Sequence, residues 1–194
     1  MGAIAAAISR RGENVVPQVV QILNELRHRG TDSHRIATPN SLKTANSLKK
    51  MAQEAIEDLS STVALGHNLS LVFPNEQLSY LLGNGYKFFF EGQTFPSSNL
   101  SAIETFLRNS RSDVQENCAN IIKEIEGSYI FGIASQNRLL IGRDSLGTTP
   151  LYYGENQNTL AVASERKALW KIGIKNVKSF PPGNLAKISV KRFV

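Results

Sequence analysis

Histidine and cysteine, which often act as catalytic groups or metal ligands, are few in this 194-residue sequence. The histidines are His28, His34 and His67. They have no metal-type spacing, and the single cysteine, Cys118, adds no second ligand. Ser33 and Ser70 have no evident base and orienting group. Cys118 shares the apolar face of a predicted helix over 114–125, which favours a packing role. These residues predict neither a metal site nor a nucleophile activated by a triad.

An arginine and an aspartate, Arg143 and Asp144, follow directly after a predicted strand. The strand belongs to a hairpin of two apolar runs, 129–134 and 139–141, that are joined by a short polar turn. Charged residues at such a corner usually hold a turn through local hydrogen bonds and an ion pair, which is the role we expect here. Further strands are predicted at 151–153 and 160–163. Ser164 is expected to cap the helix that follows, with Glu165 in its first turn.

The rest of the chain predicts an α+β fold with a largely antiparallel sheet. Small apolar residues over 2–9 indicate a buried strand, and helical periodicity follows over 15–26 and 48–59. Strands are predicted over 63–67 and 69–72, as two strands or as one strand with a bulge. Gly83-Asn84-Gly85 between apolar runs predicts a hairpin. Helices are expected over 101–107 and 114–125.

Length and composition are those of a globular protein, and we expect one domain over residues 1–194. Hydrophobic residues make up 41% of the chain and charged residues 20%, which is sufficient for a core without a structural metal or disulfide. The net charge of +6 is spread along the sequence, with the most basic stretch over 167–192, so we expect a solvated basic surface and no nucleic-acid site. One cysteine and no apolar run of about 20 residues favour a cytoplasmic protein.

The run from Gly142 to Gly154, G-R-D-S-L-G-T-T-P-L-Y-Y-G, is followed by A-S-E-R-K-A-L and by P-P-G. This spaced pattern resembles the glutamine amidotransferase domain that opens asparagine synthetases, a class II domain of the N-terminal-nucleophile type. The segment H-R-G-T-D-S-H-R-I is similar to that family's H-R-G-P-D-S-x-G-I. The resemblance implies a four-layer α-β-β-α sandwich. The helix over 48–59 is more typical of other branches of the superfamily. The motif residues, which we interpret as structural, are Arg143, Asp144, Gly147, Pro150, Tyr152, Ser164 and Glu165.

The same resemblance implies a chemistry that this sequence lacks in several places. In the family, an N-terminal cysteine attacks the glutamine amide, an Asn-Gly pair stabilises the oxyanion, and an arginine and an aspartate bind the substrate. Here Gly2 stands at the nucleophile position, and Glu91-Gly92 aligns with the Asn-Gly pair. Asn68 lies where the arginine is lost, and Ala102 replaces the aspartate. Asn84-Gly85 is an alternative placement of the Asn-Gly pair.

The resemblance therefore predicts an amidotransferase-like domain that has lost glutaminase activity. We expect it to serve as a structural or regulatory partner of an ATP-dependent synthetase domain, to need no cofactor or metal, and to present residues 143–171 to its partner. Self-association as a homodimer is compatible with this role. Two alternatives stay open. One is an active glutamine amidotransferase with an altered site, and the other is a module that binds a small metabolite or nucleic acid.

Overall fold

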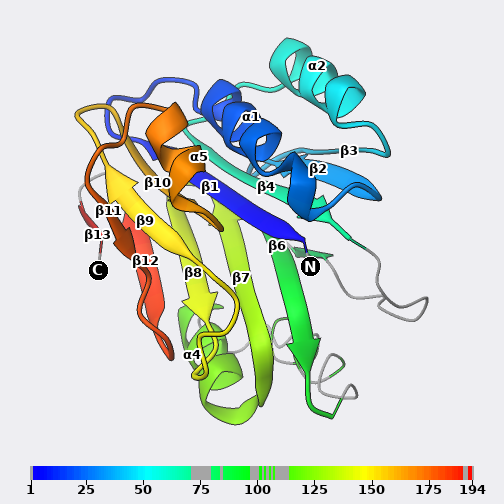
Figure 1. Cartoon of the computed structure of the whole chain (residues 1–194), viewed down its shortest axis with the longest axis vertical. Helices are drawn as coiled ribbons and strands as arrows, with labels where there is room; N and C mark the ends of the chain where they lie inside the picture. Colours follow the sequence, from blue (N-terminus) through cyan, green and yellow to red (C-terminus); the bar gives the residue numbers. More distant parts are fainter. Residues whose placement is uncertain are drawn as a thin grey trace.

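Two antiparallel sheets lie face to face and form the centre of the computed structural model (Figure 1). The structure describes residues 2–70, 80–83, 85–96, 101, 103, 105, 107, 114–189 and 192–193. Within this part of the chain, sheet A has the strand order β11-β9-β10-β1-β4-β2-β3 and sheet B the order β13-β12-β8-β7-β6-β5. All strand pairs among the described residues are antiparallel, which confirms the predicted α+β class.

The strands are short to medium in length, and each sheet combines segments that lie far apart in the sequence. Sheet A consists of β1 (Ala3–Ser9), β2 (Ser33–Ala37), β3 (Leu42–Ala45), β4 (Val63–Leu69), β9 (Tyr152–Glu155), β10 (Thr159–Ala163) and β11 (Val177–Ser179). Sheet B consists of β5 (Tyr80–Gly83), β6 (Tyr86–Thr94), β7 (Gly127–Ser135), β8 (Arg138–Arg143), β12 (Leu185–Ser189) and β13 (Arg192–Phe193).

Helices cover the outer face of each sheet. They are α1 (Val16–Glu25), the 3-10 turn η1 (Arg27–Arg29), α2 (Leu48–Asp58), α4 (Val114–Glu124) and α5 (Arg166–Lys171). Figure 1 shows α1, α2 and α5 on sheet A, and α4 at the opposite side on sheet B. One apolar cluster lies between these three helices and sheet A, a second lies between the two sheets, and a third lies between sheet B and α4. The predicted four-layer α-β-β-α sandwich is therefore confirmed.

Local patterns predicted most of these elements. Helices were expected where α1, α2 and α4 lie, and Cys118 is fully buried in the α4 layer, as its position on the apolar face indicated. Where two strands or one bulged strand were expected over 63–67 and 69–72, the described residues form one strand, β4, over Val63–Leu69, and residues 71 and 72 lie outside the described part of the chain. Strands β2 and β3 were not expected. Among the helices that the structure describes, none is long and apolar enough to cross a bilayer.

The corner at Arg143 and Asp144 is held by backbone contacts. The guanidinium of Arg143 donates to the carbonyl oxygens of Thr149 at 2.9 Å, Gly147 at 2.5 Å and Phe180. The Asp144 carboxylate accepts from the backbone N–H groups of Tyr129, Leu146 and Gly147 at 2.8–3.0 Å. The expected ion pair between the two side chains is not formed in the described structure. Each side chain is instead hydrogen-bonded to backbone groups of the corner.

The predicted cap at Ser164 is also wrong. Helix α5 begins at Arg166, and no side chain caps it. The Ser164 hydroxyl instead lies against β1, where it accepts from the Ile4 N–H at 3.0 Å and lies 3.4 Å from the Ile4 carbonyl oxygen. Ser164 is fully buried, so the bond to the neighbouring strand satisfies a hydroxyl that could not reach water.

Candidate functional site

Two of the predicted site positions, Gly2 and Glu91, come together between the sheets. Gly2 directly precedes β1 in sheet A, and Glu91 lies in β6 of sheet B. The Gly2 N–H donates to Oε1 of Glu91 at 2.5 Å. The Glu91 residue is only 7% exposed, so its carboxylate is bonded inside the sandwich. The alignment of Glu91 with the oxyanion position and of Gly2 with the nucleophile position thus corresponds to a direct contact in the fold.

Residue 2 has no room for a side chain in this arrangement. A Cβ atom built on Gly2 would lie 2.3 Å from the carbonyl oxygen of Asn68 and 2.3 Å from Oε2 of Glu91. Both distances are well inside van der Waals contact, and the Asn68 oxygen belongs to the backbone of β4. The space that a nucleophilic side chain at this position would need is therefore filled by the Glu91 carboxylate and by β4.

His67 completes this contact and was not among the predicted site residues. Its Nε2 lies 2.9 Å from Oε2 of Glu91, and its ring centroid lies 5.6 Å from that of Phe89. The residue is fully buried, and its Nδ1 has no hydrogen-bond partner among the described residues. Burial lowers the pKa of His67, and Arg35 and His34 lower it further, while the hydrogen bond and the charge of Glu91 oppose the shift.

This burial predicts an acid-sensitive stability. Because the pKa of His67 is lower in the folded protein than in the unfolded chain, the unfolded chain takes up the proton first. We expect the free energy of unfolding to be unaffected by this group above the unfolded pKa of about 6.5, and to fall below it by up to about 1.4 kcal/mol per pH unit. Urea unfolding at a series of pH values measures this slope.

A pair of histidine variants separates His67 from the other acid-titrating groups. His67→Gln keeps a donor toward Glu91 but cannot titrate, so its stability should depend less on pH in this range. His28→Gln is the matched control, since His28 lies on the surface with about half of its side chain exposed. The prediction fails if His67→Gln and the parent chain show the same slope.

Asn68 is engaged in packing contacts on β4. Its Oδ1 lies 2.9 Å from Nδ1 of His34, and its Nδ2 donates to the Leu23 carbonyl oxygen at 2.9 Å. The residue is fully buried. These bonds join β4 to β2 and α1, so the Asn68 side chain has a structural role in this state. Ala102 and Asn84, the other predicted positions, lie outside the described residues.

Gly92 is required by the close approach of two strands. Its φ is +133°, and a Cβ atom there would lie 2.1 Å from the Ser128 carbonyl oxygen in the neighbouring strand β7. Any side chain would strain the backbone and overlap β7. The presence of glycine after Glu91 therefore has a sufficient structural cause.

The motif residue Glu165 holds the beginning of the chain in place through Arg29. Burial raises the pKa of Glu165, but hydrogen bonds from His28, Arg29 and Lys167 outweigh this, so the pKa lies below its usual value. Arg29 also donates from Nε to the Gly2 carbonyl oxygen at 3.1 Å. Together with the bonds from Ser164 to Ile4, this network fixes Gly2 and the beginning of β1.

The remaining motif residues support neighbouring turns. The Arg166 guanidinium lies 4.9 Å from the centre of the Tyr152 ring. Gly147 both donates to Asp144 and accepts from Arg143, in the turn that leads to Pro150. Within the described ranges, no group of three or more histidine, cysteine, aspartate or glutamate side chains is placed to hold a metal ion.

Comparison with known proteins relates this geometry to a family. Residues 80–171 match the family model described as "Glutamine amidotransferase domain". The chain is 26% identical over 186 residues to the "Putative asparagine synthetase (glutamine-hydrolyzing) 1" of Methanocaldococcus jannaschii, covering 89% of this chain and 34% of the relative. It is also 26% identical over 208 residues to the amidophosphoribosyltransferase of Methanothermobacter thermautotrophicus, covering 90% of this chain and 44% of that protein. The chain thus spans less than half the length of these relatives.

A solved structure shares the fold over nearly the whole chain. The glutamine phosphoribosylpyrophosphate amidotransferase of B. subtilis superposes with a TM-score of 0.83 at 16% identity, over 99% of this chain and 48% of that one. This likeness shows the fold, and the family match adds the sequence relationship that the Gly142–Gly154 motif predicted. The chain therefore resembles glutamine amidotransferase domains, in sequence over residues 80–171 and in fold over nearly its whole length.

Proposed function

We propose that residues 1–194 form a single amidotransferase-type domain that has lost glutamine hydrolysis and serves as a structural or regulatory partner of a synthetase domain. The observation that carries the proposal is the Glu91 carboxylate lying where a side chain at residue 2 would stand, 2.3 Å from the Cβ position of Gly2. Glycine has no nucleophilic side chain, so residue 2 cannot form a thioester with glutamine.

The same carboxylate is unsuited to oxyanion stabilisation. Oxyanion sites use preorganised hydrogen-bond donors, and an ionised carboxylate repels the developing negative charge. One oxygen of Glu91 accepts from Gly2 and the other is bonded to His67. Both oxygens thus have structural partners inside the sandwich. The loss of the nucleophile and the replacement of the oxyanion group are linked structurally, because Gly2 and Glu91 are in direct contact.

The lengths of the relatives support the proposed partner. Both curated relatives described above are more than twice as long as the part that this chain matches. One bears the name of an asparagine synthetase, and an ATP-dependent synthetase domain is therefore the partner that we propose. Purification of the protein from its native extract tests this, and absence of any synthetase-like protein in the purified material counts against it.

The second candidate is an active amidotransferase with an altered site. It is favoured by the glutamine-hydrolysing name of that same relative and by Arg35, a buried cation opposite His67 in the pairing of β2 with β4. The Arg35 guanidinium lies 4.6 Å from the centre of the Tyr80 ring. In this alternative, Arg35 would bind the carboxylate of glutamine in place of the missing arginine.

Ammonia release from glutamine distinguishes the two candidates. We expect the purified protein, with its N-terminus verified by mass spectrometry, to release no more ammonia than a control without protein. An active glutaminase assayed in parallel shows that the measurement is sensitive enough. Turnover that survives further purification and is lost in Arg35→Ala would establish the second candidate and overturn the first.

A further inference from the structure

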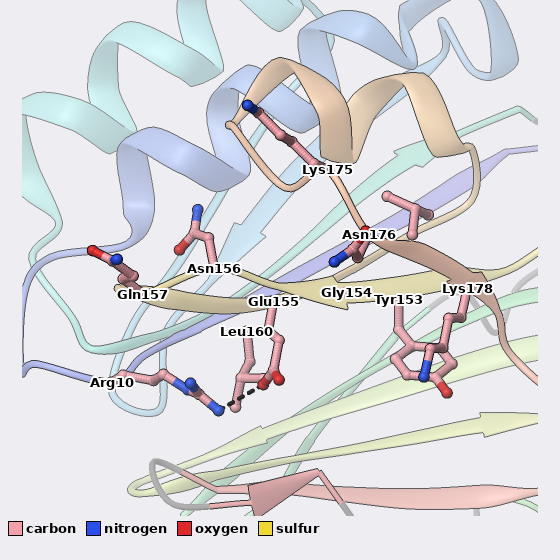
Figure 2. A pocket seen from close by; sticks show the side chains of 11 residues that line it. Arg10, Tyr153, Gly154, Glu155, Asn156, Gln157, Leu160, Lys175, Asn176 and Lys178 are labelled. Atoms are coloured by element: carbon pink, nitrogen blue, oxygen red, sulfur yellow. Dashed lines mark hydrogen bonds and ion pairs between the residues drawn. The ribbon is translucent and has the colours of Figure 1, made fainter.

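A cavity of about 870 Å³ with a mixed polar and apolar lining lies at the β11 edge of sheet A, away from Gly2 and Glu91. It is formed by strands β9 and β11, the turn between β9 and β10, and Arg10 at the end of β1 (Figure 2). A volume of this size accommodates a small metabolite. None of the residues that line it has a role in the proposed loss of glutaminase activity.

The walls of this cavity are held by hydrogen bonds. Asn156 Oδ1 accepts from the N–H groups of Asn158 and Thr159 at 2.9 and 2.8 Å, and its Nδ2 donates to the Ile172 carbonyl oxygen at 3.4 Å. These bonds join the β9–β10 turn to the segment that follows α5. Strand β11 pairs with β9, with Lys178 opposite Tyr153. A ligand would thus meet a preformed surface and would not have to order a loop.

The lining carries an excess of two positive charges. Its cations are Arg10, Lys175 and Lys178, and its one carboxylate is Glu155. Glu155 is paired with Arg10 at 2.6 Å. Neither Lys175 nor Lys178 is paired with a carboxylate in the part of the chain that the structure describes, and Nε of Arg10 has no hydrogen-bond partner there. Uncompensated cations in a concave site favour an anionic ligand.

The positions of the side chains indicate the kind of anion. Figure 2 shows Lys178 beside Tyr153 on the same side of β9 as Arg10, whereas Lys175 extends on the other side of that strand. Arg10 and Lys178 can thus approach a ligand from the same side of β9, and Lys175 adds positive charge from the other side. The Tyr153 ring and the buried Leu160 add apolar surface next to them.

We propose that this cavity binds a small metabolite that carries a phosphate or pyrophosphate group. Arg10 and Lys178 contact the phosphate oxygens, Lys175 neutralises charge at the other side of β9, and Tyr153 packs against the organic part. Arginine offers planar, forked donors to phosphate, and lysine acts as a point charge. Glu155 weakens anion binding because it competes for Arg10.

Isothermal titration with inorganic pyrophosphate tests the site directly. We expect saturable binding with a Kd of about 1 mM or tighter that weakens as salt is added. The double variant Lys175→Ala with Lys178→Ala should bind about tenfold more weakly, since both charges are removed. Lys49→Ala with Lys50→Ala, which removes the same charge from α2, is the matched control and should bind like the parent chain. Equal weakening in both double variants would show a general charge effect and overturn the proposal.

Three further measurements test the effect of Glu155, the preference for phosphate over carboxylate, and the role of Tyr153. Glu155→Gln should bind pyrophosphate about threefold more tightly, because it releases Arg10 and removes a negative charge. This gain cannot arise from poor folding. Succinate, a dicarboxylate, should bind more weakly than pyrophosphate, and phenyl phosphate should lose affinity in Tyr153→Ala. Unchanged or weaker binding by Glu155→Gln, equal binding of succinate, or no saturable binding to the parent chain would overturn the proposal.

Discussion

Replacing Gly2 with cysteine is expected to lower the free energy of unfolding by about 2–3 kcal/mol and to yield no ammonia from glutamine. The new Cβ would lie 2.3 Å from both the Asn68 carbonyl oxygen and Oε2 of Glu91. Relief requires β1 or β4 to move away from the Asn68 contact and the Glu91 side chain to leave its bonds to Gly2 and His67. Urea unfolding gives the stability change, and the ammonia assay gives the activity.

The Glu91→Ala background serves as the control for this prediction. Removal of the carboxylate eliminates one of the two close contacts, so Gly2→Cys should cost less there than in the parent chain. The cost should not vanish, because the Asn68 oxygen belongs to the backbone and remains in place. A double-mutant cycle measures the coupling between the two sites. Full stability of Gly2→Cys in the parent chain would contradict the proposed filling of the site.

Arg143→Ala is expected to destabilise the fold by about 3 kcal/mol or more. Arg143 is only 6% exposed and holds the carbonyl oxygens of Gly147, Thr149 and Phe180. These oxygens belong to two segments that lie more than thirty residues apart in the chain, so one guanidinium joins the corner after β8 to the segment after β11. Truncation leaves three acceptors without their charged donor. Thermal or urea unfolding measures the loss.

Two other arginine variants make this prediction specific. Arg143→Lys should recover only part of the stability, since an ammonium group lacks the fork geometry that reaches three carbonyl oxygens. Arg138→Ala is the control at the other end of β8, where the side chain is partly exposed, and a change within about 0.5 kcal/mol is expected. If Arg143→Ala and Arg138→Ala cost the same, the corner does not depend on the guanidinium.

The contacts of the motif around Arg143 are structural, so the fold alone is a sufficient reason for this pattern. Arg143 and Asp144 hold backbone groups, Ser164 bonds to β1, and Glu165 holds Arg29 against Gly2. Each contact stabilises the sandwich whether or not glutamine is hydrolysed. Sequence resemblance at these positions is therefore evidence of the fold, while the proposed loss of activity rests on residues 2 and 91.

Periodicity and turn residues in the sequence were sufficient to predict most elements. Apolar residues at helical spacing predicted α1, α2 and α4, and Asn84-Gly85 between apolar runs predicted the pairing of β5 with β6. These signals are local, because hydrophobic spacing and turn chemistry depend on residues a few positions apart. Strands β2 and β3 were missed because they are short and rich in polar residues such as His34, Arg35 and Lys43.

The candidate site depended on contacts that no local pattern encodes. Gly2 and Glu91 are 89 residues apart, and His67 lies 24 residues before Glu91, yet all three meet between the sheets. The sequence alone showed that residue 2 has no nucleophile, since side-chain chemistry is a property of the residue itself. Only the packing of β1 and β4 against β6 decided that Glu91 fills the space next to Gly2. The pairing of β10 with β1 likewise decided that Ser164 binds β1 instead of capping α5, because a buried hydroxyl takes the partner that the tertiary structure brings to it.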